Sequence, residues 1–273
     1  MHSGATKAHY FHAEANSLGG FIDSPVQKMM PPQASSSLPA VGGHVSHQAQ
    51  AFNFEGIVSC RSTQTRVSGR YVEEDDSHSA VAISVVEGLN IGEIITADRV
   101  VAQVSIQHPA SGGAPIVSLT GSRFEGLRIG GCDAALSLNT SLLEGGDGAA
   151  AAQEPITWPI FHKTGKQQAA KLVNSAKGKD GFQWIVDRYN WLASETKASG
   201  RALCSVVDGV SQAAPCRSFG HVLYIPNFGK VILGEIVAYP ASVRICMIRA
   251  ELGSPASGGM NLGNAVVNGD VFP

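Results

Sequence analysis

The chain has 273 residues, of which 20 are basic and 22 acidic, and its net charge is −2. Hydrophobic residues make up 44% of the chain, charged residues only 15%, and glycine occurs 31 times, a profile that favours strands joined by glycine turns. The balanced charge argues against general nucleic-acid binding, and because no stretch reaches about 18 consecutive apolar residues we expect no transmembrane segment.

The N-terminal segment lacks the basic start and the apolar stretch of a secretory signal, which predicts a cytoplasmic protein by default. Small and large side chains alternate over residues 7–22. This alternation predicts a strand that stops at Gly19-Gly20. Four prolines and a run of serines follow over residues 23–43. This composition predicts an extended arm with polyproline character, so residues 1–43 are expected to form an N-terminal strand and arm.

A first β unit is expected over residues 44–143, because β-branched residues recur there with a period of two. The acidic segment 73–77 is expected to join two of its strands as a hairpin tip. The expected strands are 46–52, 55–61, 64–73, 78–87, 91–107, 114–121, 123–129 and 133–139.

Residues 144–195 interrupt the β pattern. The small residues over 144–153 predict a linker and a boundary. Thr164 is placed to cap a helix over 165–177, and a second helix is expected at 181–194. Five residues share one face of the second helix: Phe182, Ile185, Val186, Tyr189 and Leu192. The segment therefore predicts a helical hairpin inserted between β units.

A second β unit is expected over residues 196–273. Its strands are expected at 201–208, 219–226, 229–239 and 242–251, and the glycine-rich tail from Gly253 is expected to be irregular. None of the five cysteines forms a Cys-x-x-Cys pair, which argues against a zinc ribbon or a thioredoxin site. Cys246 is expected to be a buried thiol, whereas Cys204 and Cys216 flank a predicted hairpin and could pair in an oxidising environment.

A sequence block is repeated in the chain. Residues 91–106, closed by Pro-Ala-Ser-Gly-Gly at 109–113, reappear in looser form at 233–248, closed by the same five residues at 255–259. Such a repeat predicts two related β-rich units, each covering an apolar face of the other.

The repeat places Glu93 and Glu235 at matching positions. Paired carboxylates that face each other across a sugar carry out glycoside hydrolysis. A turn or sheet-edge position, with the charge in solvent or held by Arg99 or Arg244, is the simpler interpretation. No Gly-x-Ser-x-Gly motif is present, and the segment 164–166 lacks the flanking residues of a P-loop.

Four short pieces, residues 8–20, 37–43, 94–102 and 121–130, occur in an order that is shared with a known group of proteins. On these pieces residues 8–131 resemble the bacterial β-rich proteins labelled choice-of-anchor P. The resemblance implies a surface-associated protein without catalytic residues. The chain departs from that group because it shows neither a leader peptide nor a C-terminal anchor, and because its helical hairpin is foreign to the pattern.

Two His-x-x-His pairs, His9/His12 and His44/His47, are candidate ligands for zinc or copper. On strands, a spacing of three directs the two members of a pair to opposite faces, which is poor geometry for chelation. The acidic run 73–76 is a candidate calcium site, but it lacks the ligand spacing of an EF-hand, so a solvated hairpin tip is the stronger interpretation.

The sequence therefore predicts a mainly β protein, a sandwich or jelly-roll-like unit with internal duplication and a two-helix insertion. We expect a non-enzymatic structural protein without a cofactor that self-assembles into an oligomer or surface layer through its N-terminal arm and sheet edges. The alternative is a carbohydrate-binding or carbohydrate-cleaving sandwich. Candidate residues for an assembly or ligand surface are Tyr10, Phe11, Trp158, Trp184 and Trp191.

Overall fold

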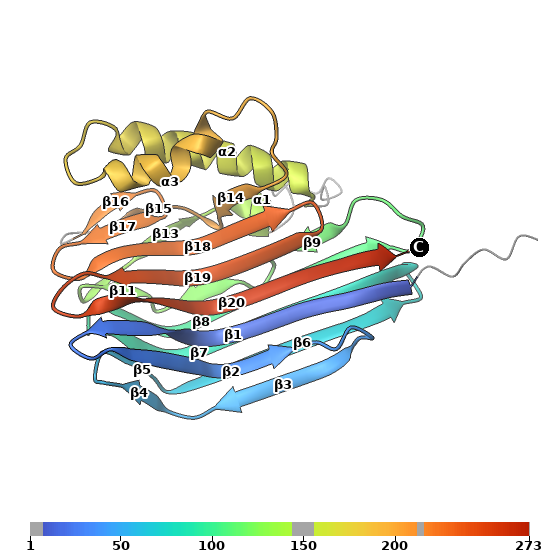
Figure 1. The fold of residues 1–273 in the computed structure, drawn as a ribbon, viewed down its shortest axis with the longest axis horizontal. Coiled ribbons are helices and arrows are strands. Elements are labelled where there is room, and N and C mark those ends of the chain that lie inside the picture. Colours follow the sequence, from blue (N-terminus) through green and yellow to red (C-terminus); the bar gives the residue numbers. More distant parts are fainter. Residues whose placement is uncertain (1–7, 144–155, 212–215, 273) are drawn as a thin grey trace, which may run out of the picture.

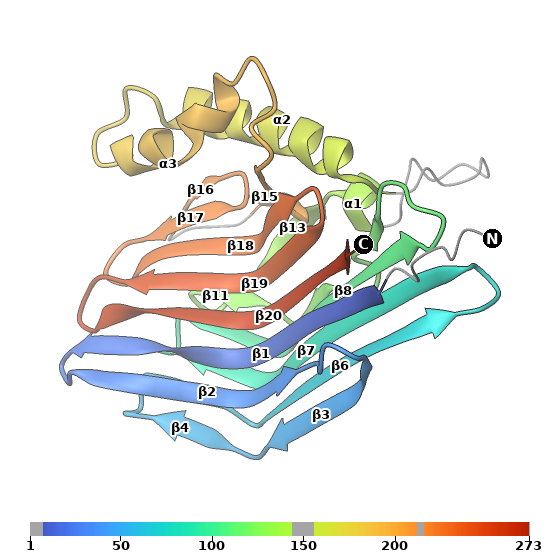
Figure 2. The same ribbon diagram turned by 45° about the vertical axis from the view of Figure 1, so that its right-hand side comes forward.

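Two antiparallel sheets pack face to face, and two helices lie along one side of them (Figure 1 and Figure 2). The computed structural model describes residues 8–143, 156–211 and 216–272. The mainly β class and the two-helix insertion are confirmed. The linker expected at 144–153 lies outside the described residues.

The first sheet, sheet A, runs in the order β16-β17-β18-β19-β20-β1-β2, and β14 also pairs with β18. Its strands are β1 (Ala8–Ser24), β2 (Lys28–Ser37), β14 (Ala202–Ser205), β16 (Arg217–Phe219), β17 (Val222–Ile225), β18 (Gly229–Tyr239), β19 (Ser242–Leu252) and β20 (Ser257–Phe272). The sheet therefore combines the first strands of the chain with the last ones.

The second sheet, sheet B, is centred on β7 and β8, with β6 and then β3 beyond β7. Its strands are β3 (Gly43–Ala49), β4 (Phe52–Phe54), β5 (Val58–Cys60), β6 (Ser62–Val72), β7 (Ser77–Ile91), β8 (Ile95–Pro109), β9 (Ile116–Ser118), β10 (Arg123–Glu125), β11 (Arg128–Ile129) and β12 (Cys132–Asp133). A small third pair, β13 (Ala135–Leu138) with β15 (Val207–Ser211), and a short helix α1 (Thr140–Leu143) lie beside it.

The two ends of the chain differ from their sequence predictions. Residues 28–37, expected in a free arm, form strand β2, and residues 257–272, expected to be irregular, form β20, which pairs with β1 along its length. Proline is tolerated in β2 because this strand lies at the edge of sheet A, where half of the N–H groups need no partner strand. The β1 strand is therefore a central strand of the sandwich.

The helices are α2 (Trp158–Ala176) and α3 (Gln183–Ala193), and Figure 1 shows both beside β16, β17 and β18. The first helix begins earlier than expected: Pro159 occupies its first turn, and Thr164 is buried inside it instead of capping it. The predicted apolar face of α3 packs on Phe219, Val222 and Ile232 of sheet A. No helix in the described part of the chain is long and apolar enough to cross a membrane.

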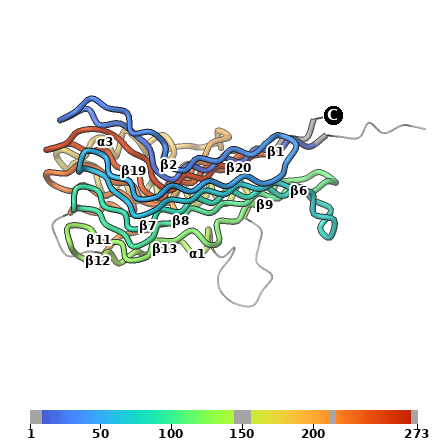
Figure 3. Tube along the Cα trace, turned by 90° about the horizontal axis from the view of Figure 1, so that it is seen from below, coloured from blue at the N-terminus to red at the C-terminus, as the bar shows by residue number. Residues whose placement is uncertain are grey.

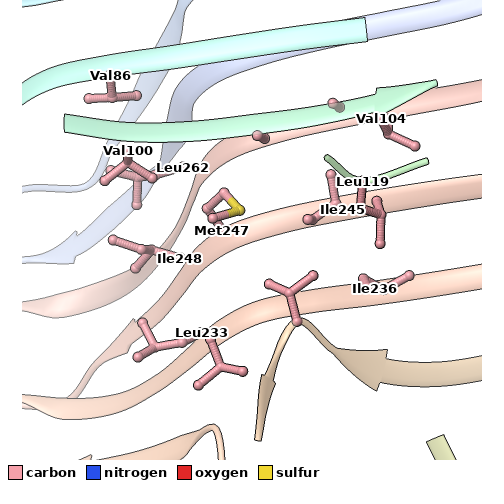
Figure 4. Close-up of a cluster of buried hydrophobic side chains, with 14 of the residues drawn as sticks. Val86, Val100, Val104, Leu119, Leu233, Ile236, Ile245, Met247, Ile248 and Leu262 are labelled. Carbon is pink, nitrogen blue, oxygen red and sulfur yellow. The ribbon is translucent and has the colours of Figure 1, made fainter. Parts of the chain in front are cut away.

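The core lies between the two sheets. Val100 and Val104 of β8 face Ile245 and Met247 of β19, as Figure 4 shows, and all four side chains are buried. Figure 3 shows the two layers from below. Because each strand presents alternate residues to this core, the other residues of sheet A face outward.

The two copies of the sequence repeat lie in different structures. Gly92 and Glu93, both with positive φ, form the turn between β7 and β8, whereas Gly234 and Glu235 lie inside strand β18. The two glutamates therefore do not hold equivalent positions, and they belong to different sheets.

Candidate functional site

Glu235 is the centre of a buried ion cluster. It projects from the outer face of sheet A and is only 2% exposed. Its carboxylate pairs with Arg188 of α3 and with Arg249 of β19, whose Nη2 lies 2.9 Å from Oε2. Arg244, which the sequence suggested as a partner, does not take this role; Arg188 and Arg249 do. The cluster joins the helical layer to the sheet.

The backbone at Gly234 directs Glu235 outward. Leu233 packs in the core, and strict alternation would send Glu235 to the same side. The positive φ of Gly234 (+59°) changes the alternation, so that Ile236 and Ala238 face the core instead. A Cβ atom at Gly234 would lie 2.5 Å from Cγ2 of Val206, so both the conformation and the space require glycine.

Two further titratable groups lie under α3. The hydroxyl of Tyr189 is 3.3 Å from Nε2 of His221, and both side chains are buried. Burial lowers the pKa of His221 to about 3, so the imidazole is neutral at physiological pH. Burial also raises the pKa of Tyr189, and the nearby Glu235 acts in the same direction. This pair is a neutral contact between α3 and sheet A.

The geometry does not support glycoside hydrolysis by Glu93 and Glu235. Glu93 is exposed in the β7–β8 turn, while Glu235 lies beneath α3 with its charge compensated twice. A retaining or inverting pair of carboxylates must flank one bond, and these two do not face each other.

The outer face of β19, β20 and β1 forms a groove of about 580 Å³ next to this cluster. Arg249, Asn261 and Gly19 lie side by side on three neighbouring strands. One row further along, Glu251, Gly259 and Phe21 are neighbours in the same way. Figure 1 looks onto these strands.

We call this surface the polar face and define it by Asn16, Phe21, Arg244, Arg249, Asn261 and Asn264. No local sequence pattern predicts this surface. The signal was present in the tail, where asparagine recurs at 261, 264 and 268, but without the pairing of β20 to β1 and β19 these residues had no shared surface.

The tryptophans support the helical layer. Trp184 and Trp191 are partly buried against the cluster that packs α3 on the sheet, and Trp158 packs against the main core. Lys230 lies 4.7 Å from the Trp184 ring centroid and Arg201 lies 4.3 Å from that of Trp191. Each of these two rings therefore makes a cation–π contact with a neighbouring basic side chain.

Of the two aromatic candidates in β1, only one lies at the surface. Tyr10 is 48% exposed, whereas Phe11 is buried in the core. The candidacy of Phe11 for an assembly surface is therefore wrong, because its position in the alternation of β1 faces sheet B.

Three histidines gather at one end of the sandwich. His9 stacks on His78 with ring centroids 4.1 Å apart, and the ring of His108 lies 5.3 Å from that of His9. Burial lowers the pKa of His78, although the charge of Asp76 acts in the opposite direction. Stacked rings direct their nitrogen atoms sideways, not toward one shared point.

The predicted histidine pairs do not form one ligand set. His12 lies on the outer face of sheet A, 3.7 Å from Glu14, while His44 and His47 lie on β3 of sheet B. His9 faces the opposite side of β1 from His12, as its spacing predicts. No group of three or more potential ligands that could hold a metal ion occurs among the described residues.

The acidic run 73–76 forms the turn between β6 and β7, as predicted. Tyr71 donates a hydrogen bond to Oδ1 of Asp76 (2.5 Å), and Gln107 donates one to Oδ2 of Asp75 (3.0 Å). Both carboxylates therefore already accept hydrogen bonds from side chains of the same protein.

All five cysteines are free thiols, including Cys204 and Cys216. Cys246 is buried as expected, and burial raises the pKa of its thiol to about 11. The protonated thiol is therefore the form present at physiological pH.

Two long edge strands lie next to each other where the sheets meet. In the described structure β2 pairs only with β1, and β3 pairs only with β6. Ser36 of β2 connects this edge to sheet B: its hydroxyl lies 3.2 Å from Nδ1 of His47 on β3 and 2.8 Å from Oγ1 of Thr65 on β6. The outer backbone edge of β3 remains without a partner strand among the described residues.

A family model described as Domain of unknown function (DUF8256) matches residues 9–239. No curated protein and no solved structure matches the chain. The resemblance to choice-of-anchor P proteins stays a prediction.

Proposed function

We propose that this chain, which belongs to the family described as Domain of unknown function (DUF8256), is a non-enzymatic structural protein that self-associates through strand β3. The observation that carries the proposal is the open edge of β3, seven residues long and paired on one side only. The expected N-terminal arm is part of sheet A, so the proposal rests on the edge alone.

The composition of β3 supports pairing with another strand. Natural sheet edges are usually protected by proline, lysine or inward charges. The β3 sequence, Gly-His-Val-Ser-His-Gln-Ala, contains neither proline nor a Lys, Arg, Asp or Glu residue. Val41, 89% exposed in the turn before β3, adds apolar surface beside this edge.

A second copy of the chain is the partner that fits this edge. Two β3 strands that pair antiparallel about a twofold axis near Ser46, the middle residue of the strand, extend sheet B continuously across both copies. Such a contact is self-complementary, because every exposed backbone group meets its counterpart on the same strand of the other molecule.

The test introduces the missing edge protection. In the double variant Ser46→Lys/Gln48→Lys, two exposed side chains on β3 become cationic, and like charges face each other across the pair. Light scattering coupled to size-exclusion chromatography is expected to give twice the 28.5 kDa chain mass for the wild type and the single chain mass for the variant.

The matched control is Gln33→Lys, which adds a charge to the other edge strand, β2, and is expected to retain the wild-type mass. Circular dichroism should show unchanged strand content in all three proteins. A wild type that stays at the single chain mass over a wide range of concentration contradicts the proposal, as does a double variant with the wild-type mass.

A further inference from the structure

We propose that the groove on the polar face binds an acidic oligosaccharide, with a uronate carboxylate at Arg244 and Arg249 and a sugar ring against Phe21. The groove lies on the outer face of sheet A, whereas β3 is an edge of sheet B. The inference is therefore independent of self-association.

The arginine end of the groove carries excess positive charge. Arg188 and Arg249 share the single carboxylate of Glu235, so this cluster has a net charge of about +1. Arg244 donates a hydrogen bond to Oδ1 of Asn264 (3.4 Å) and has no carboxylate within 4.0 Å in the described structure. Guanidinium groups bind carboxylates with two parallel hydrogen bonds, which favours a ligand with this group.

The two acidic residues that line the groove, Glu251 and Asp23, are placed away from this end. Glu251 lies across from Gly259, in the row of Phe21, and 3.1 Å from Lys230. Asp23 lines the groove together with Phe21, at the opposite end from Arg244. The charge of the groove is therefore polarised along its length, and an anionic group is attracted to the arginines.

Phe21 supplies an apolar platform. A Cβ atom at Gly259 would lie 3.2 Å from Cε1 of Phe21, so the aromatic ring rests directly over the backbone of β20. The ring is still 42% exposed. An exposed aromatic side chain on a sheet offers apolar surface to the C–H groups of a sugar ring.

Amide side chains cover the space between the platform and the arginines. Asn261 lies on the strand beside Arg249, and Asn264 and Asn16 are neighbours across β20 and β1 further along. Asn261 lines the groove, and its amide group offers hydrogen-bond donors to sugar hydroxyls. Asn264 is only 7% exposed, and its Oδ1 already accepts a hydrogen bond from Arg244. Gly19, next to Asn261, adds no side chain to this row.

Isothermal titration calorimetry with trigalacturonate tests the inference, and galactotriose, which lacks the carboxylates, is the neutral comparison. We expect trigalacturonate to bind at least about tenfold more tightly than galactotriose. Arg244→Gln should weaken trigalacturonate about tenfold, since it removes a charge-assisted hydrogen bond and leaves the Glu235 cluster intact. Phe21→Ala should weaken both sugars.

The control variant is Arg70→Gln, which removes one exposed arginine from β6 on sheet B and should leave binding unchanged. Equal weakening by Arg70→Gln and Arg244→Gln would show unspecific charge attraction and overturn the inference. So would equal affinity for the two sugars, or no heat of binding with either. Repeating the titration in the Ser46→Lys/Gln48→Lys background separates this result from the oligomeric state.

Discussion

Strands β2 and β3 are neighbouring edges of the same sandwich, yet only the sequence of β2 contains residues that protect an unpaired edge. Strand β2 contains Lys28, Pro31 and Pro32, which block or repel an added strand. Strand β3 has none of these features, although it too pairs on one side only among the described strands. Since both edges face the same solvent, this difference supports the proposal that β3 pairs with a second copy while β2 does not.

Removing the two prolines that protect β2 should have the largest effect on the association of the chain. The double variant Pro31→Thr/Pro32→Thr restores two backbone N–H groups and introduces β-branched residues that favour a strand. We expect a second mode of association, seen by light scattering as species heavier than the wild type that grow with concentration. Pro240→Thr, at an exposed proline in the β18–β19 turn, is the control and should keep the wild-type mass. Equal masses for both variants would show that the prolines do not guard β2.

The hydroxyl of Ser36 links β2 to His47 of β3 and to Thr65 of β6, and its loss should have a smaller effect. Ser36→Ala removes buried hydrogen bonds to Thr65 (2.8 Å) and His47 (3.2 Å) and is expected to lower the free energy of unfolding by about 1 kcal/mol. Urea unfolding measures this difference.

Two further variants sharpen that measurement. Ser37→Ala, at an exposed neighbour, should leave the free energy of unfolding almost unchanged. Ser36→Ala/Thr65→Val should recover part of the loss, because it removes both polar partners instead of leaving Thr65 with an unmet hydroxyl. A double variant less stable than Ser36→Ala by a further full kcal/mol would count against a direct bond.

The smallest effect is expected from the exposed ion pair between Lys28, at the start of β2, and Glu55, in the turn between β4 and β5. Its atoms are 2.5 Å apart, but the two side chains are 57% and 33% exposed. Exposed pairs contribute about 0–1 kcal/mol because water and salt screen them. Lys28→Ala should therefore change the free energy of unfolding by less than about 0.5 kcal/mol. It should leave the mass measured by light scattering unchanged. A loss comparable to that of Ser36→Ala would show that this pair, too, holds the edges together.

Several elements could be predicted because their signal is local. The alternation in residues 79–86, the acidic tip at 73–76 and the apolar face of α3 each depend on neighbours within one or two turns or a single strand. Helix α2 begins earlier than the 165–177 predicted from Thr164, because Pro159 suits the first turn of a helix.

The candidate sites could be predicted only in part. Glu235 was singled out as a residue to test, but its partners Arg188 and Arg249 come from a helix and a strand that no local pattern joins. The polar face likewise needs β19, β20 and β1 side by side, so asparagines that are distant in sequence become neighbours only in the folded sheet.

The sequence by itself determined the mainly β composition, the helical hairpin and the buried character of most strands. These features depend on the pattern of apolar and polar side chains along consecutive residues. Tertiary structure alone decided that β1 and β2 join β20 in one sheet, and that Gly234 directs Glu235 to the outer face. Strand pairing between distant segments follows from which apolar faces and backbone edges meet, and a period-two pattern specifies a face but not the partner that will cover it.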